Sequence, residues 1–96
     1  MKVDMDADFI LAKQLFEQNE IKRSLAVLNE CISVNVCDYQ SFLLRGRIFY
    51  KMQKWGNAMN DYSSVLELDP DNQEAKTGLE LTRNILGYFN PDMFNP

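Results

Sequence analysis

Apolar side chains recur every three to four residues along most of the chain, and no strand-length segment alternates between apolar and polar residues. This period is that of amphipathic helices that bury one face. The pattern predicts five helices, over about residues 6–18, 21–34, 39–52, 55–68 and 73–88. The segment Asp69-Pro70-Asp71-Asn72 separates the last two helices, because proline cannot continue a helix and Asp71 or Asn72 can cap the next one.

The third and fourth predicted helices repeat the first two at a fixed distance. Ala12 and Gly46 are both small, and 46 minus 12 is 34. The same shift superposes large residues on large and small on small: Leu15 on Phe49, Phe16 on Tyr50, Ile21 on Trp55, Ser24 on Ala58, Leu28 on Tyr62 and Cys31 on Val65. The chain therefore contains an internal repeat. Its first copy is degenerate, since Asp8 stands where the second copy has Phe42.

The second copy resembles a tetratricopeptide (TPR) repeat, which has the same 34-residue period. The resemblance rests on Phe42, Gly46, Phe49, Ala58, Tyr62, Val65 and Pro70, and it covers about residues 5–90. It implies an all-α fold in which two antiparallel helix hairpins stack in a right-handed superhelix, followed by a C-terminal capping helix. We expect one domain with repeat one over about 5–38, repeat two over about 39–72, the capping helix over about 73–88 and a non-helical tail over 89–96.

The fifth predicted helix starts a third repeat without completing it. Glu80 stands 34 residues after Gly46, and a glutamate does not fit where two helix backbones nearly touch. About half of this helix is apolar around its circumference, wider than the ~100° stripe that one packing face requires. Its second stripe, formed by Leu81, Ile85 and Tyr88, is expected to be covered either by Met93 and Phe94 of the tail or by a second molecule.

Composition narrows the function classes. The chain has 96 residues, a formal net charge of −4 and no histidine, which argues against nucleic acid as the partner and removes the commonest general base and metal ligand. The two cysteines, Cys31 and Cys37, lack zinc-site spacing, and Cys31 is expected to pack as a small apolar residue. With no phosphate loop and no Ser/His/Asp or Cys/His set, we expect a non-enzymatic protein that needs no cofactor or metal.

The N-terminal residues contain no apolar segment typical of a secretory signal, and no apolar run approaches membrane-spanning length. The sequence therefore favours a cytoplasmic protein that does not contact a membrane. A secreted chain without its signal peptide would give the same pattern.

The TPR resemblance implies a concave groove that takes extended peptides or partner helices. Carried over position by position, the groove residues are Phe9, Lys13, Phe16, Leu43, Arg47, Tyr50, Thr77 and Leu81. Lys13 and Arg47 are equivalent, since 13 plus 34 is 47, and two such cations predict a ligand with acidic and apolar residues. The resemblance also implies that the carboxylate clamp by which some TPR domains hold chaperone peptides is absent, because its five positions hold Phe9, Lys13, Leu44, Glu74 and Gly78.

The predicted function is that of a protein–protein interaction module, similar to short stand-alone bacterial TPR proteins. The alternative is a self-assembling structural protein whose groove or capping helix is buried in a homodimer. A third interpretation is a part of a longer TPR array.

Overall fold

The computed structural model describes residues 5–34 and 39–89, with the side chains of residues 7–34 and 39–87. This part of the chain contains five helices and no strand: α1 (Met5–Glu17), α2 (Ile21–Val34), α3 (Tyr39–Lys51), α4 (Trp55–Leu68) and α5 (Gln73–Phe89). The all-α prediction is confirmed, and the predicted limits of the second and fourth helices are correct. The boundary predicted for the tail is wrong by one residue, since Phe89 still belongs to α5.

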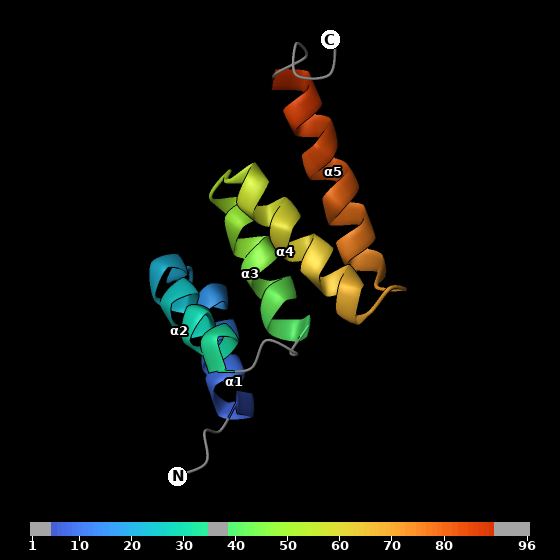
Figure 1. The fold of residues 1–96 in the computed structure, drawn as a ribbon. Helices are drawn as coiled ribbons and strands as arrows, with labels where there is room; N and C mark the ends of the chain where they lie inside the picture. The colour runs from blue at the N-terminus through green and yellow to red at the C-terminus, as the bar shows by residue number, and fades with distance from the viewer. Residues whose placement is uncertain (1–4, 35–38, 90–96) are drawn as a thin grey trace.

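The helices pack as consecutive antiparallel neighbours (Figure 1). α1 packs on α2, α3 packs on α4, and α5 packs on the other side of α4. The two hairpins meet mainly through α2 and α3. Each hairpin alone would leave an apolar face in water, so stacking is what buries the core.

The two hairpin turns repeat the same backbone geometry. Asn19 and Gln53, which are 34 residues apart, both adopt positive φ angles, of 63° and 61°. In each turn the next N–H donates to a carbonyl five residues earlier, Glu20 to Leu15 and Lys54 to Phe49, both at 2.8 Å. This is the bond pattern that closes a helix through a left-handed residue. The internal repeat therefore extends from side-chain size to the backbone.

Two clusters of buried residues form the core, one where α1 and α2 meet α3 and one where α4 meets α5. The first is made by Ala12, Leu28, Leu44 and Ile48, and the second by Ala58, Tyr62, Val65 and Ala75. At the small position of the first hairpin, the Ser24 hydroxyl donates a 2.6 Å hydrogen bond to the carbonyl oxygen of Ala12. Cys31 is buried as predicted, whereas Cys37 lies outside the described residues.

An asparagine fixes the start of α5. The Asn72 side-chain oxygen accepts a 2.9 Å hydrogen bond from the backbone N–H of Ala75, and its amide donates to Asp69 at 3.2 Å. This is N-cap geometry, in which a side chain satisfies an otherwise unpaired N–H of the first turn. Of the two predicted caps, Asn72 is therefore the one used, and it sets the direction in which α5 leaves α4.

Arg45 links three helices. From α3 it donates two 2.8 Å hydrogen bonds to the carboxylate of Asp61 in α4, which is 3% exposed, and a 3.0 Å bond to Asn29 in α2. Its guanidinium also lies over the rings of Phe42 and Phe49, at 5.6 and 5.7 Å from their centroids. The charge of Asp61 is thus buried with a bidentate partner, the arrangement that a buried carboxylate requires.

Candidate functional site

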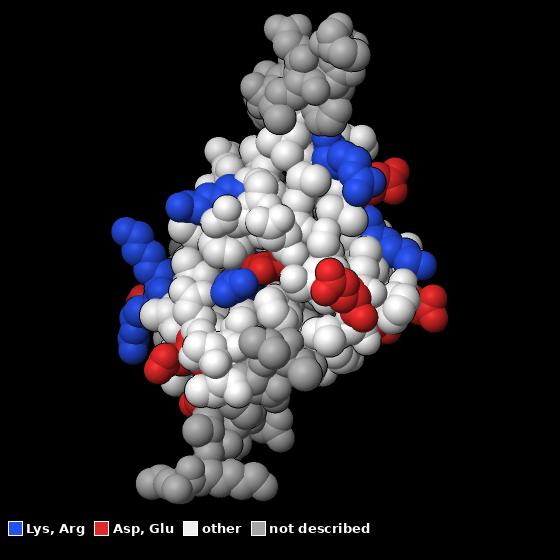
Figure 2. All heavy atoms as spheres, viewed as in Figure 1, with Lys and Arg blue, Asp and Glu red and all other residues white. Residues whose placement is uncertain are grey.

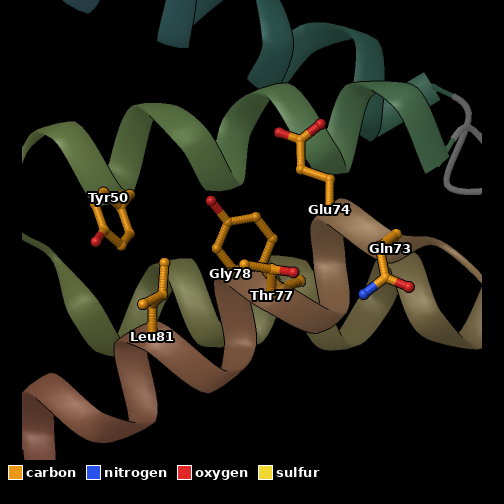
Figure 3. Close-up of a pocket in the computed structure, with 7 residues that line it drawn as sticks. Tyr50, Gln73, Glu74, Thr77, Gly78 and Leu81 are labelled. Carbon is orange, nitrogen blue, oxygen red and sulfur yellow. The ribbon is translucent and has the colours of Figure 1, made fainter.

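Two neighbouring hollows flank α3, one between α1 and α3 and the other between α3 and α5. The α1–α3 hollow has a volume of about 260 Å³ and is lined by Phe9, Lys13, Tyr39, Gln40, Leu43, Leu44, Arg47 and Asn72. The α3–α5 hollow has a volume of about 380 Å³ and is lined by Tyr50, Tyr62, Gln73, Glu74, Thr77, Gly78 and Leu81 (Figure 3). The first has mixed polarity, whereas the second is lined mainly by apolar groups.

The hollows contain seven of the eight residues predicted for the groove. Four line the α1–α3 hollow: Phe9, Lys13, Leu43 and Arg47. Three line the α3–α5 hollow: Tyr50, Thr77 and Leu81. Phe16 lines neither of these two hollows; its half-buried ring packs against the first core cluster, with the Lys51 ammonium 5.9 Å from the ring centroid. Its place in the groove stays a prediction.

The ring of Tyr62 forms the floor of the α3–α5 hollow and is held between two glycines. A Cβ atom on Gly46 of α3 would lie 2.9 Å from this ring, and one on Gly78 of α5 would lie 2.6 Å from it. Real Cβ atoms essentially never make contacts this short, so both positions require glycine in the observed packing. The two glycines allow α3 and α5 to approach opposite edges of one tyrosine, and this approach shapes the hollow.

An ion pair connects the two hollows. Arg47 of α3 donates to both carboxylate oxygens of Glu74 in α5, with its Nη2 at 2.6 Å from Oε1. The hydrogen bonding to the Glu74 carboxylate raises the pKa of Arg47, and burial opposes this effect. Both side chains are 41% exposed, so the pair contributes little to stability but fixes the rotamers at the boundary of the hollows.

This ion pair changes the predicted electrostatics of the groove. The sequence suggested two equivalent cations, but the charge of Arg47 is offset by Glu74. Lys13 is exposed and forms no ion pair with another described residue. Lys13 is therefore the groove cation best placed for an acidic ligand group, and the two positions differ despite their equivalence in the repeat.

Eight lining residues were not among the predicted groove residues: Tyr62, Gln73, Glu74 and Gly78 in the α3–α5 hollow, and Tyr39, Gln40, Leu44 and Asn72 in the α1–α3 hollow. Of these, Leu44, Glu74 and Gly78 had been named only as positions of the absent clamp. The period of 34 directed attention to Glu80 as the close-packing position, whereas the glycine that touches Tyr62 stands two residues earlier. The sequence did contain one signal that could have identified Gly78. A glycine inside a helix costs about 1 kcal/mol relative to alanine, so Gly78 in the middle of an amphipathic helix indicates a close approach.

Burial affects the acidity of Tyr62. It raises the pKa of the phenol to about 12, and the charge of Glu74 acts in the same direction. Tyrosine in an unfolded chain ionises near pH ~10, so the folded chain holds a proton that the unfolded chain loses between about pH 10 and 12. The associated stability is fully present below pH ~10 and is lost as the pH rises through this window.

We expect Tyr62→Phe to weaken this loss of stability at high pH. Urea unfolding of both proteins at several pH values between about 9 and 12 measures the effect. The free energy of unfolding of the wild type should decline more steeply with pH than that of the phenylalanine variant, because only the wild type carries the buried phenol. Parallel declines would show that Tyr62 ionises equally easily in the folded and unfolded chains.

Charged side chains of both signs are scattered over the face shown in Figure 2, with wide uncharged areas between them. In the described part of the chain, no cluster of three or more His, Cys, Asp or Glu side chains could hold a metal ion. None of its helices has the length and apolar content needed to span a bilayer. The two hollows are thus the features of the described surface that we take as the candidate site.

Comparisons with known proteins give two partial similarities, and no protein-family model matches the sequence. Over 82 residues the chain is 30% identical to the UDP-N-acetylglucosamine–peptide N-acetylglucosaminyltransferase of Giardia intestinalis, a match covering 85% of this chain and 6% of that protein. Over 77 residues it is 25% identical to the DnaJ homolog subfamily C member 7 homolog of Schizosaccharomyces pombe, covering 80% of this chain and 16% of that protein. The chain therefore spans only a small fraction of the length of either relative. Both relatives contain TPR repeats.

Proposed function

We propose that this chain is a non-catalytic, TPR-like module that binds an extended segment of a partner protein along the groove formed by the two hollows. One observation carries the proposal. Seven residues placed on one face by the repeat line two hollows, and the Arg47–Glu74 ion pair links the lining of one hollow to that of the other. The similarity to segments of two larger proteins supports a module rather than an enzyme.

The two hollows favour different ligand groups. The α3–α5 hollow suits an apolar side chain, since Tyr50, Tyr62 and Leu81 line it. The α1–α3 hollow places Lys13 beside Phe9 and Leu43, which suits an acidic residue with an apolar stem or neighbour. We therefore expect the ligand segment to combine a large apolar residue with an acidic one.

A library of short random peptides, panned against the immobilised full chain, tests this function. Selected peptides should bind the wild type and bind Leu81→Lys at least about tenfold more weakly, because a lysine in the apolar hollow removes ~1.4 kcal/mol or more of apolar contact. Leu68→Lys is the matched control, since Leu68 is 42% exposed, Leu81 is 45% exposed, and Leu68 lines neither hollow.

A second pair of variants tests the acidic preference in the same assay. Lys13→Glu should weaken the binding of those selected peptides that contain Asp or Glu. Lys22→Glu is the control, because it makes an equal charge change at an exposed position outside both hollows and should leave this binding unchanged. If Leu81→Lys and Leu68→Lys bind the selected peptides equally well, the groove is not a peptide site.

The alternative is a homodimer in which the exposed Leu81 and the rest of the α3–α5 hollow are buried against a second copy. Light scattering of the wild type and of Leu81→Lys separates the two functions. A dimer that Leu81→Lys dissociates would favour self-assembly, whereas a monomer in both cases favours the interaction module.

A further inference from the structure

The α3–α5 hollow is an apolar site without an occupant among the described residues. Leu81 is 45% exposed at its edge, beside the rings of Tyr50 and Tyr62. The charged group in its lining is Glu74, whose carboxylate is already bound by Arg47. An uncharged, large side chain is therefore the group that this hollow would accept with the greatest gain in buried apolar area.

The sequence that follows α5 contains two such side chains. Residues 90–96, which lie outside the described residues, read Asn-Pro-Asp-Met-Phe-Asn-Pro. Pro91 cannot extend the α5 hydrogen-bond ladder, and it disfavours helical geometry at the residue before it. Met93 and Phe94 are adjacent, so one short segment presents a flexible thioether and an aromatic ring together.

The lengths of the two segments match. Phe89 ends α5 eight residues after Leu81, which corresponds to ~12 Å along a helix at ~1.5 Å per residue. Phe94 follows Phe89 by five residues, and an extended chain covers ~3.3–3.6 Å per residue, or about 17 Å. A chain that reverses direction directly after Phe89 has enough length to return Phe94 to the level of Leu81.

The apolar end of the hollow also lies toward the C-terminal end of α5, from which residues 90–96 continue. Figure 3 shows Tyr50 and Leu81 at the end of the hollow that lies away from Gln73, the first residue of α5. A segment that returns from the C-terminal end of α5 therefore meets this apolar end first. Glu74, which would disfavour burial of a methionine or phenylalanine beside its charge, lies nearer to the opposite end.

We propose that Met93 and Phe94 bind in the α3–α5 hollow of their own chain, so that residues 90–96 act as an internal ligand of the groove. This inference rests on the proposed function, because it uses the same groove. The consequence is competition: a partner segment must displace the internal one, and its observed affinity is reduced by the effective concentration of the tethered segment. The displacing segment must itself offer a large apolar side chain to Tyr50, Tyr62 and Leu81.

A labelled synthetic peptide with the sequence of residues 90–96 tests the proposal on the full chain. We expect it to bind the double variant Met93→Ala, Phe94→Ala about tenfold more tightly than the wild type, because the variant lacks the tethered competitor. Asn95→Ala is the matched control within the same segment and should bind like the wild type. Adding Leu81→Lys to the double variant should abolish binding, which places the peptide in this hollow.

Trp55 gives a second readout that needs no label. It is the chain's one tryptophan, and its ring lies 5.1 Å from that of Tyr50, which lines the hollow. The fluorescence of Trp55 should differ between the wild type and the double variant, and saturating peptide should return the variant to the wild-type spectrum. Identical spectra with and without the peptide would contradict occupancy of this hollow.

Three results would overturn the proposal. One is equal affinity of the peptide for the wild type and the double variant, and another is no binding to either. The third is a dimer of the wild type, seen by light scattering, that the double variant does not form, because the segment would then occupy the hollow of a second copy. If library peptides bind the groove while the 90–96 peptide does not, this inference alone fails. If no peptide of either kind binds, the proposed function fails as well.

Discussion

Gly78→Leu is expected to lower the free energy of unfolding by about 2–3 kcal/mol, because its side chain would have to enter the space that the ring of Tyr62 occupies. The ring cannot move away, since Gly46 contacts its other edge. For a domain of this size, such a loss lowers the midpoint of thermal unfolding by roughly 8 °C or more. Gly46→Leu should act in the same direction, with a loss of several degrees.

Gly56→Leu is the internal control for this prediction. No atom lies within 4 Å of a Cβ placed on Gly56, which is exposed in the first turn of α4. Leucine is a better helix former than glycine by up to ~1 kcal/mol, so this variant should be as stable as the wild type or slightly more so. Equal melting points for Gly78→Leu and Gly56→Leu would contradict the close packing around Tyr62.

A double variant separates the packing effect from an effect on the helix itself. Tyr62→Ala empties the space beside Gly78, so Gly78→Leu should cost less in this background than in the wild type. Residues in direct contact show coupling energies of about 0.5–3 kcal/mol in such cycles. Thermal unfolding of the wild type, both single variants and the double variant gives the coupling. Additive losses would indicate that the leucine disturbs α5 without contacting Tyr62.

Asp61→Ala is expected to destabilise the fold by about 2–3 kcal/mol. The variant removes the bidentate partner of Arg45 and leaves a guanidinium partly buried between the rings of Phe42 and Phe49. Loss of one partner from a fully buried ion pair costs about 3–5 kcal/mol. We expect a smaller cost here, because the Arg45 side chain is 21% exposed and water can hydrate part of its guanidinium.

Urea unfolding measures this effect. Glu67→Ala is the matched control, because Glu67 is an exposed carboxylate on the same helix and should change stability by less than ~0.5 kcal/mol. Asp61→Asn keeps the shape and one acceptor oxygen, so we expect a loss between those of the two alanine variants. If Asp61→Ala is no more destabilising than Glu67→Ala, the Arg45 linkage does not support the arrangement of α2, α3 and α4.

The proposed function and the internal ligand together suggest how specificity arises in this groove. If the chain functions as proposed, the α3–α5 hollow would select for apolar volume, and Lys13 would select for negative charge in the adjoining hollow. Residues 90–96 include Asp92 next to Met93 and Phe94, so this segment contains both types of group. A partner that competes with it is expected to present an acidic residue and a large apolar residue within a short extended stretch.

The sequence by itself determined the helices and the repeat. Helical periodicity placed four of the helix starts correctly, and the first was wrong by one residue. The 34-residue shift anticipated the paired small positions, Ser24 and Ala58, both fully buried. These features follow from local rules. An amphipathic helix must bury its apolar stripe, a proline ends a helix, and a capping asparagine starts one, whatever the rest of the fold is.

Only the tertiary structure decided which residues meet across the groove. Lys13 and Arg47 are equivalent in the repeat, but Arg47 pairs with Glu74 of α5, whereas the equivalent position of α3, in the hollow that Lys13 lines, holds the uncharged Gln40. Gly78 became essential because α5 crosses α4 where the ring of Tyr62 projects, a point set by the crossing of two helices and not by their shared period. Periodicity fixes the face of a helix on which a side chain lies, whereas its contacts depend on how neighbouring helices are rotated and shifted when they pack.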